Sequence, residues 1–376
     1  MQTRGMRLRQ WGDVVACYNL PDILIGNGAS IAVWPEFGYS SLYKKAVSPS
    51  IENPLDEFCQ AHFTADDTTN FEHILRSLKD AEAVLRRLPR FSEHYPAINE
   101  IQRQYDMIRQ ALSESVKAAH IPFNSVTQEQ LLAIRVELGK YGRVYSTNYD
   151  LLIYWAIMAV GNRHFDDCFR GGDVPFDPAR VEGSYAKTRV YYLHGALHIY
   201  LTPSGRVLKR TASCALNLLD LFGTEYKDGA RPLIITEGKS EDKWAVISSN
   251  PYLRFGFDHL SRPSAGLVVF GHSLTLESDR HIIDAIKRRK PETLAISIYP
   301  SGTKYDIAAQ TSLLRKQFED VEVIFFDSRS HPLGSEDLSA AHQVNAFALR
   351  RWERCSPEEQ MVRCFGTTVA PWADLG

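Results

Sequence analysis

The sequence lacks any apolar run close to the roughly 18 residues that a helix needs to cross a bilayer. It also lacks the apolar stretch of a secretory signal, because none follows the basic first ten residues. We therefore expect a cytoplasmic protein without a membrane partner.

Cysteine is sparse and scattered, which argues against two common kinds of site. None of the six cysteines forms a Cys-x-x-Cys pair, so we expect neither a disulfide framework nor a four-thiolate zinc site. Histidines such as His62, His73, His94 and His120 show no HxxxH or Cys/His ligand spacing, and no bound metal is expected. A Gly-x-x-x-x-Gly-Lys loop is absent too, which excludes ATP hydrolysis of the P-loop type.

Charge of one sign is not in excess. The formal net charge is -2, whereas an obligate nucleic-acid binder is typically strongly basic. We expect no direct sequence-specific binding of nucleic acid. A chain of 376 residues with 44% hydrophobic residues is long and apolar enough to bury one large core.

What the sequence does contain is a series of short apolar runs rich in branched residues. The clearest runs span residues 22–25, 143–146, 190–193, 233–236, 267–270, 294–299 and 321–326. Segments with helical spacing, such as 279–290 and 305–319, lie between several of them. Strands that alternate with helices and are apolar on both faces predict an α/β fold with a doubly wound, mostly parallel, Rossmann-like sheet.

The stretch 51–140 differs, because it has long helical patterns at 69–88, 96–119 and 127–139 and no convincing strand. We interpret it as an all-helical insertion. Residues 1–50 then form the first part of the α/β domain and residues 141–330 the remainder. Residues 331–376 are expected to form a C-terminal helix and tail.

The first candidate site follows the first predicted strand, where residues 22–30 are DILIGNGAS. Gly26 and Gly28 can adopt backbone angles that a Cβ forbids, which lets amide groups approach a phosphate. A helix that begins near Ser30 would add partial positive charge. Ile31 replaces the third glycine of the GxGxxG fingerprint, which weakens an ordinary dehydrogenase assignment. A turn that needs glycine for geometry alone is an equal alternative.

The second candidate site is the sequence TNYD at residues 147–150, again at the end of a predicted strand. Thr147, Asn148 and Asp150 would lie where parallel sheets bind their ligands. The alternative is helix capping, because an apolar helical run follows and these residue types are preferred at helix starts. Capping is favoured for at least one of them, most of all Asp150.

Two further strands end in polar residues. His194 is followed by a glycine and has a side chain suited to proton transfer near neutral pH, although a structural role is the usual one for a lone histidine. His198 alternates with apolar residues and fits that structural role better. At the last of these strands, Gly271 allows close approach of a ligand and Ser273 can bond a ribose or phosphate oxygen. No GxSxG motif supports a nucleophilic serine there.

The order of these motifs is more specific than any one of them. LIGNGASIA, STNYDLLIYWA, YLHGALH and VVFGHSL together resemble the sirtuin-like NAD-binding superfamily, and most closely a bacterial subfamily of sirtuin-like domains without an assigned function. The resemblance spans roughly residues 22–300. Other bacterial branches of the superfamily hydrolyse NAD, often as antiphage effectors. The two Cys-x-x-Cys pairs of protein-deacylating sirtuins have no counterpart here, which favours NAD cleavage over deacylation.

The resemblance implies a role for each matching residue. Asn148 corresponds to the asparagine that faces the nicotinamide ribose, Asp150 to the acidic residue beside it, and His194 to the catalytic histidine. The residues expected to bind the rest of the cofactor are Gly26, Asn27, Gly28, Ala29, Ser30, Thr147, Gly271 and Ser273.

These roles predict an NAD glycohydrolase that releases nicotinamide and ADP-ribose, with NAD as its substrate. Asn148 would hold the ribose and the attacking water, and His194 would accept a proton. A defence enzyme of this kind must be silent until triggered, so a homo-oligomer and a partner ATPase or other defence protein are candidate assemblies. The alternatives are a non-catalytic NAD or ADP-ribose sensor, an ADP-ribosyl transferase or cyclase, and a structural subunit of a larger complex.

Overall fold

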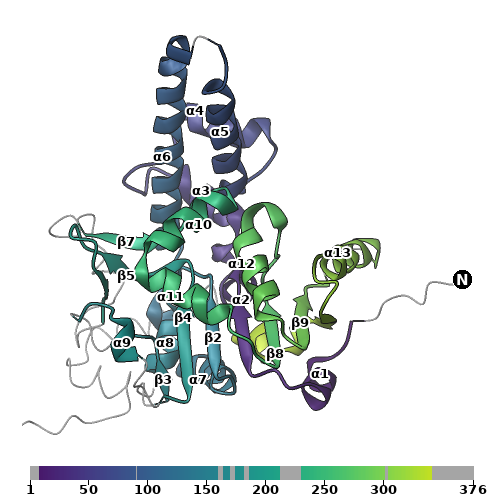
Figure 1. Cartoon of the computed structure of the whole chain (residues 1–376). Helices are drawn as coiled ribbons and strands as arrows, with labels where there is room; N and C mark the ends of the chain where they lie inside the picture. Colours follow the sequence, from purple (N-terminus) through teal and green to yellow (C-terminus); the bar gives the residue numbers. More distant parts are fainter. Residues whose placement is uncertain are drawn as a thin grey trace, which may run out of the picture.

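The structure is a computed structural model of the chain, and it describes residues 8–89, 91–159, 164–169, 174–181, 186–211, 230–300 and 304–340. Its centre is a seven-stranded sheet in the order β10-β9-β8-β1-β2-β4-β3, in which every neighbouring pair is parallel. The strands are β1 (Asp22–Ile25), β2 (Arg143–Ser146), β3 (Phe165–Asp166), β4 (Thr188–Tyr192), β8 (Gly266–Phe270), β9 (Thr293–Ile298) and β10 (Glu322–Asp327). Helices flank this sheet, so the predicted parallel α/β fold is confirmed (Figure 1).

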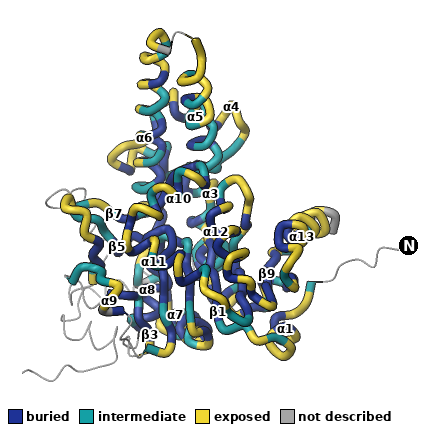
Figure 2. Tube along the Cα trace, viewed as in Figure 1, coloured by how far each residue is buried: buried dark blue, intermediate teal, exposed yellow. Residues whose placement is uncertain are grey.

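Both faces of the sheet are covered, which explains the continuous apolar runs in the sequence. Every residue of β1, β8 and β9 is buried, and buried chain fills the centre of the molecule in Figure 2. Helices α10 (Ser240–Ser249), α11 (Pro251–Leu260) and α12 (Leu276–Arg289) pack against one another. Four other helices of the described chain lie before β1 or after β2: α1 (Trp11–Cys17), α8 (Leu152–Met158), α9 (Pro178–Val181) and α13 (Lys304–Gln317).

Between β1 and β2 the described chain forms helices and short 3-10 turns. The helices are α2 (Asn27–Val33), α3 (Tyr39–Ala46), α4 (Glu57–Ala65), α5 (Phe71–Leu85), α6 (Tyr95–Ala118) and α7 (Gln128–Leu138). α5 and α6 pack side by side and rise above the sheet (Figure 1). The buried residues of α5 recur three or four positions apart, which is the apolar stripe of a helix that packs on one side. α7 begins with a capping box formed by Thr127 and Gln130.

A second sheet contains the antiparallel strands β5 (Gly195–Leu201), β6 (Val207–Lys209) and β7 (Arg231–Ile234), in the order β6-β5-β7. The assignment of residues 233–236 to the parallel sheet is therefore wrong, because the strand in this region pairs with β5. The turn from β4 into β5 explains the change of partner. Gly195 has a φ of +74° there, and the chain leaves the parallel sheet for an antiparallel hairpin.

The last described residues continue from β10 through 3-10 turns at Ser328–Ser330, Pro332–Gly334 and Glu336–Leu338. The second and third of these turns pack against α2 and α7, and the first packs against α1. The predicted C-terminal helix and tail falls largely on residues 341–376, which lie outside the described residues. In the part of the chain that is described, no helix has both the length and the apolar character needed to cross a membrane.

Candidate functional site

The predicted site residues gather at one edge of the parallel sheet. β1, β2, β4 and β8 are neighbours, and they end in register at Ile25, Ser146, Tyr192 and Phe270. Thr147 joins two of these ends, because its amide and its hydroxyl both donate to the Ile25 carbonyl, at 3.0 and 3.3 Å. The carboxyl ends of parallel strands are where α/β folds hold ligands. The four segments singled out in the sequence therefore meet at the edge where a site is expected.

Three glycines bring the turn after β1 against the turn after β8. A Cβ on Gly26 would lie 2.6 Å from the carbonyl oxygen of Gly271, and one on Gly28 would lie 2.7 Å from the Cα of Gly271. Only Gly271 has a left-handed backbone, with a φ of +67°. The expectation that Gly26 and Gly28 need unusual backbone angles is wrong, since Gly26 has a φ of -110° and Gly28 lies within α2. These two glycines are needed because the two backbones approach so closely.

The same contact uses several of the amides that were expected to approach a phosphate. Gly26 N–H donates to the Phe270 carbonyl and Gly28 N–H to the Gly271 carbonyl, each at 2.8 Å. Ala29 N–H donates to the carbonyl of Gly26 at 3.0 Å. In this arrangement the amides of Gly26 and Gly28 hold the two turns together, and that of Ala29 is used within the turn after β1.

Other amides of the two turns remain free. Among the described residues, the N–H groups of Asn27, His272 and Ser273 have no hydrogen-bond acceptor. The side-chain amide of Asn27 donates to the Phe37 carbonyl at 3.0 Å, and Ser273 is exposed. α2 begins at Asn27, so the expected helix start near Ser30 is wrong by one turn. The free donors therefore come from Asn27 and from the turn after β8.

Ser30 instead connects the two polar residues that follow β2. Its hydroxyl donates to Asp150 Oδ2 at 2.5 Å and accepts from Asn148 Nδ2 at 2.7 Å. The other oxygen of Asp150 accepts from the amide of Leu152, the first residue of α8, at 2.8 Å. Asp150 thus bonds the start of the following helix, as the capping alternative predicted, although residue 151 occupies the cap position. The network fixes the side chain of Asn148.

The amide oxygen of Asn148 is buried and has no partner among the described residues. A cavity of about 20 Å³ lies beside Asn148 and Ser30, and a space of that size holds about one water molecule. Its other walls are mainly apolar, with Val33 and Ile134 among them. The oxygen is therefore available as an acceptor, but a sugar ring needs a wider opening than the one beside it here.

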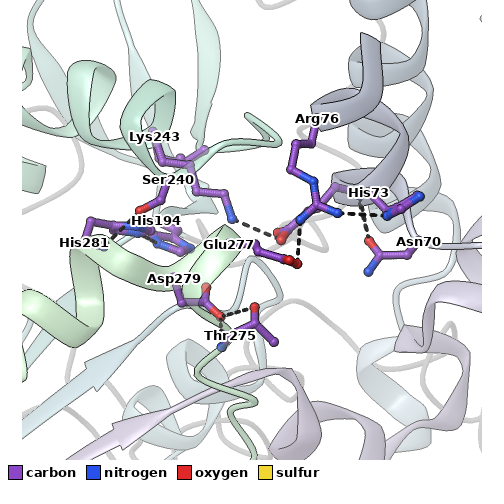
Figure 3. Close-up of polar contacts among 12 residues, drawn as sticks. Asn70, His73, Arg76, His194, Ser240, Lys243, Thr275, Glu277, Asp279 and His281 are labelled. Atoms are coloured by element: carbon purple, nitrogen blue, oxygen red, sulfur yellow. Dashed lines mark hydrogen bonds and ion pairs between the residues drawn. The ribbon is translucent and has the colours of Figure 1, made fainter. Parts of the chain in front are cut away.

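His194 lies beyond the end of β4 in a buried contact with a second histidine. Its Nε2 is 2.9 Å from Nε2 of His281 on α12, and His281 Nδ1 is 2.7 Å from Ser240 Oγ on α10 (Figure 3). Burial, together with the neighbouring His281, Lys243 and His272, holds the pKa of His194 well below its usual value. The ring is therefore neutral near pH 7, and it can donate one hydrogen bond and accept another.

Two ion pairs join α5 to the helices that carry this cluster. Lys243 Nζ on α10 lies 3.1 Å from Glu72 Oε2, and the lysine side chain is 1% exposed. Arg76 on α5 pairs with Glu277 on α12 at 2.8 Å, and this glutamate side chain is 72% exposed. Figure 3 shows Lys243 beside the histidines and Arg76 reaching towards Glu277. Burial and the charge of Lys243 lower the pKa of His281 to about 3.

Two tyrosines belong to the same electrostatic neighbourhood. Glu72, burial and Asp279 hold the pKa of Tyr39 well above its usual value. The residue as a whole is 37% exposed to solvent. Burial and Glu72 likewise raise the pKa of Tyr149, whose hydroxyl donates to the Ile235 carbonyl. Both phenols are therefore protonated at neutral pH and serve as hydrogen-bonding groups.

The sequence patterns did not identify four of these residues: Glu72, Ser240, Lys243 and His281. Each lies within a helix and outside any motif, and the contact of His194 with His281 joins positions 87 residues apart. The sequence feature that could have identified them is a polar residue at a position where the helical pattern predicts a buried apolar one. His281 lies on the buried face of α12 beside Ile282 and Ile283.

A separate cavity of about 790 Å³ lies between α6 and β7 and is lined by none of the predicted site residues. Its walls include Arg109, Lys117, Arg231 and Glu237. Across the described residues, no group of three or more His, Cys, Asp or Glu side chains is placed to hold a metal ion.

Fold and site together define a parallel α/β protein whose polar residues collect at the carboxyl ends of neighbouring strands. Residues 23–333 match the family described as Domain of unknown function (DUF4917), and the chain belongs to that family. The matched segment contains every predicted site residue. No curated protein matches the chain.

Proposed function

We propose that the protein binds NAD at the carboxyl edge of its parallel sheet and cleaves the nicotinamide–ribose bond. The observation that supports this most is the placement of Asn148 and His194, each two residues beyond paired ends of the adjacent strands β2 and β4. Nicotinamide is a cationic leaving group, so its departure needs no general acid. The protein then has to orient the ribose and stabilise positive charge that develops on it.

The proposed roles follow from the hydrogen bonds that remain open. The amide oxygen of Asn148 would accept from the attacking water, for which the cavity beside it has room, or from a ribose hydroxyl if NAD binding widens that cavity. Its orientation depends on Ser30, which in turn is held by Asp150. The neutral ring of His194 would bond a second ribose oxygen. Because Asp150 holds Ser30 and Ser30 holds Asn148, Asp150 contributes by fixing the position of Asn148.

The free amides of Asn27, His272 and Ser273 would bind the pyrophosphate, because N–H groups that converge in a turn favour an anion. The exposed hydroxyl of Ser273 adds a further donor. Such contacts, remote from the reacting bond, supply binding energy that orients the ribose.

We interpret the sheet as sirtuin-like and the helices over residues 51–140 as an insertion that covers the site through α5. The ion pairs of α5 with α10 and α12 support a direct connection between this segment and the His194 cluster.

Release of nicotinamide from NAD by the purified full chain tests the proposal. His194→Gln and Asn148→Ala are compared with the control His198→Leu. His198 is fully buried on β5, and neither of its ring nitrogens has a partner among the described residues. The control therefore removes a buried imidazole without touching the site. We expect His194→Gln to lower turnover roughly 10²-fold, because the imidazole contact is lost and the ribose is misplaced.

Loss of release in both site variants, with release retained in His198→Leu, would support a glycohydrolase. Tight NAD binding without release by the wild type would instead favour a sensor. A folded wild-type protein that neither binds nor cleaves NAD would contradict the proposal.

A further inference from the structure

Ser240, His281 and His194 form a chain of three buried side chains. The main-chain N–H of His281 donates to Ser240 Oγ at 2.9 Å, so the hydroxyl oxygen already accepts one bond. The same oxygen is 2.7 Å from His281 Nδ1, and the two Nε2 atoms of the histidines are 2.9 Å apart. None of the three residues is more than 5% exposed. Each of the two side-chain contacts is therefore a single hydrogen bond with one hydrogen between its two heavy atoms. Burial keeps water from replacing either partner.

The hydroxyl hydrogen of Ser240 sets the direction of the whole chain. His281 Nδ1 is the acceptor that the described residues offer to this hydrogen, and a buried hydroxyl hydrogen without an acceptor is costly. Ser240 therefore donates to Nδ1 of His281. Burial keeps both rings neutral, so His281 carries its proton on Nε2. That N–H donates to His194 Nε2.

We propose that Ser240 and His281 are positioning residues that place the single proton of His194 on Nδ1. This is the ring nitrogen of His194 that makes no hydrogen bond with the described residues, and it is left to meet a ligand. A buried partner that fixes the tautomer of a histidine in this way acts as the aspartate of a Ser-His-Asp triad does.

The proposal changes the chemistry expected of His194. It rests on the proposed function for the group that Nδ1–H meets, which is a ribose oxygen of NAD. His194 is then a hydrogen-bond donor, in contrast to the proton acceptor predicted from the sequence. A fixed donor orients the ribose, and the attacking water gives up its proton to solvent once its oxygen has bonded to the ribose carbon that nicotinamide leaves.

The tautomer can be measured in the full chain without NAD. Long-range ¹H–¹⁵N correlation spectra of protein labelled with ¹⁵N-histidine distinguish a protonated ring nitrogen from a bare one. The His194 signals are those missing from His194→Gln. We expect a protonated Nδ1 and a bare Nε2 in the wild type. A proton on Nε2 of His194 in the wild type would overturn the proposal.

Substitutions of Ser240 and His281 test whether these two residues set the tautomer of His194. Ser240→Ala removes the directing hydroxyl, so His194 should populate both tautomers, and Ser240→Thr should restore one. His281→Leu should also release the tautomer, whereas His281→Gln keeps a donor and an acceptor. The controls are Ser115→Ala, a buried hydroxyl bonded within α6, and His259→Leu on α11. A single unchanged tautomer in both Ser240→Ala and His281→Leu would contradict the proposal.

Kinetics separate positioning from a merely structural role. We expect kcat for nicotinamide release to fall roughly 10²-fold in His281→Leu, as for a misplaced ribose, with little change in KM. His281→Gln should recover most of this loss, and equal losses in the two variants would contradict positioning. A wild type that releases no nicotinamide would refute the proposed function, whereas the NMR result would still decide the tautomer.

Discussion

Gly271 shows how single residues shape the edge of the sheet. Its φ of +67° strains any other residue, and a Cβ there would lie 2.6 Å from the amide nitrogen of Ala29. Gly205 offers a matched comparison, because its φ is +79° but nothing lies within 4 Å of its Cβ position. The two positions share the backbone strain and differ in the steric contact.

Gly271→Ala should lower the free energy of unfolding by about 2–5 kcal/mol, because overpacking adds to the left-handed strain. Gly205→Ala should lower it by about 1–2 kcal/mol from strain alone. Urea unfolding followed by circular dichroism measures both. Equal losses would show that the contact between the two turns is not tight.

Residue types at strand ends were enough to single out Ser30, Asn148 and Asp150, but not to predict how they bond. Asn148, Asp150 and Ser30 were each identified from a motif, and they form one network. The motif could not show that Ser30 is used inside that network. His281 escaped notice because a contact across 87 positions leaves no trace in local spacing.

At the scale of helices, α5 is tied to the site by one buried and one exposed ion pair. Removing one partner of a buried pair leaves a charge without compensation, whereas exposed pairs contribute little. Glu72→Gln, which strands the buried Lys243, should therefore lower the free energy of unfolding by about 3–5 kcal/mol. Glu277→Gln at the exposed pair should cost less than about 1 kcal/mol.

Chemical denaturation of the two variants checks this difference. Glu72→Leu combined with Lys243→Met should regain most of the lost stability, because both charges are then gone. A double variant as unstable as Glu72→Gln would mean that packing, and not the unpaired lysine, causes the loss.

The elements themselves were predictable where burial is two-sided. β1, β8 and β9 are buried along their whole length, so their apolar runs mark them within a residue or two. β7 was recognised as a strand but assigned to the wrong sheet, because a run of four residues does not specify its partner. β3 has only two residues and gave no pattern.

Across the described part of the whole molecule, six of the twelve histidines in the sequence are buried and have a lowered pKa. Burial is the first cause of a lowered pKa at His120, His194, His198, His259, His281 and His331. In the unfolded chain these residues take up protons near pH 6.5. In the folded chain they resist protonation, for example down to a pKa of about 3 at His281 and His331.

The folded protein should therefore lose stability as the pH falls below about 6.5, since the unfolded state binds more protons there. Each such histidine contributes about 1.4 kcal/mol per pH unit until its folded pKa is reached. Because several histidines contribute, unfolding free energies at pH 7.5 and 5.5 should differ by several kcal/mol. The carboxylates with lowered pKa, such as Glu82 and Asp327, titrate mainly below this range. His198→Leu should reduce this difference by about 1.4 kcal/mol without losing a hydrogen bond, as neither ring nitrogen of His198 has a partner among the described residues. Identical pH dependence in the variant and the wild type would show that His198 is not held neutral by the fold.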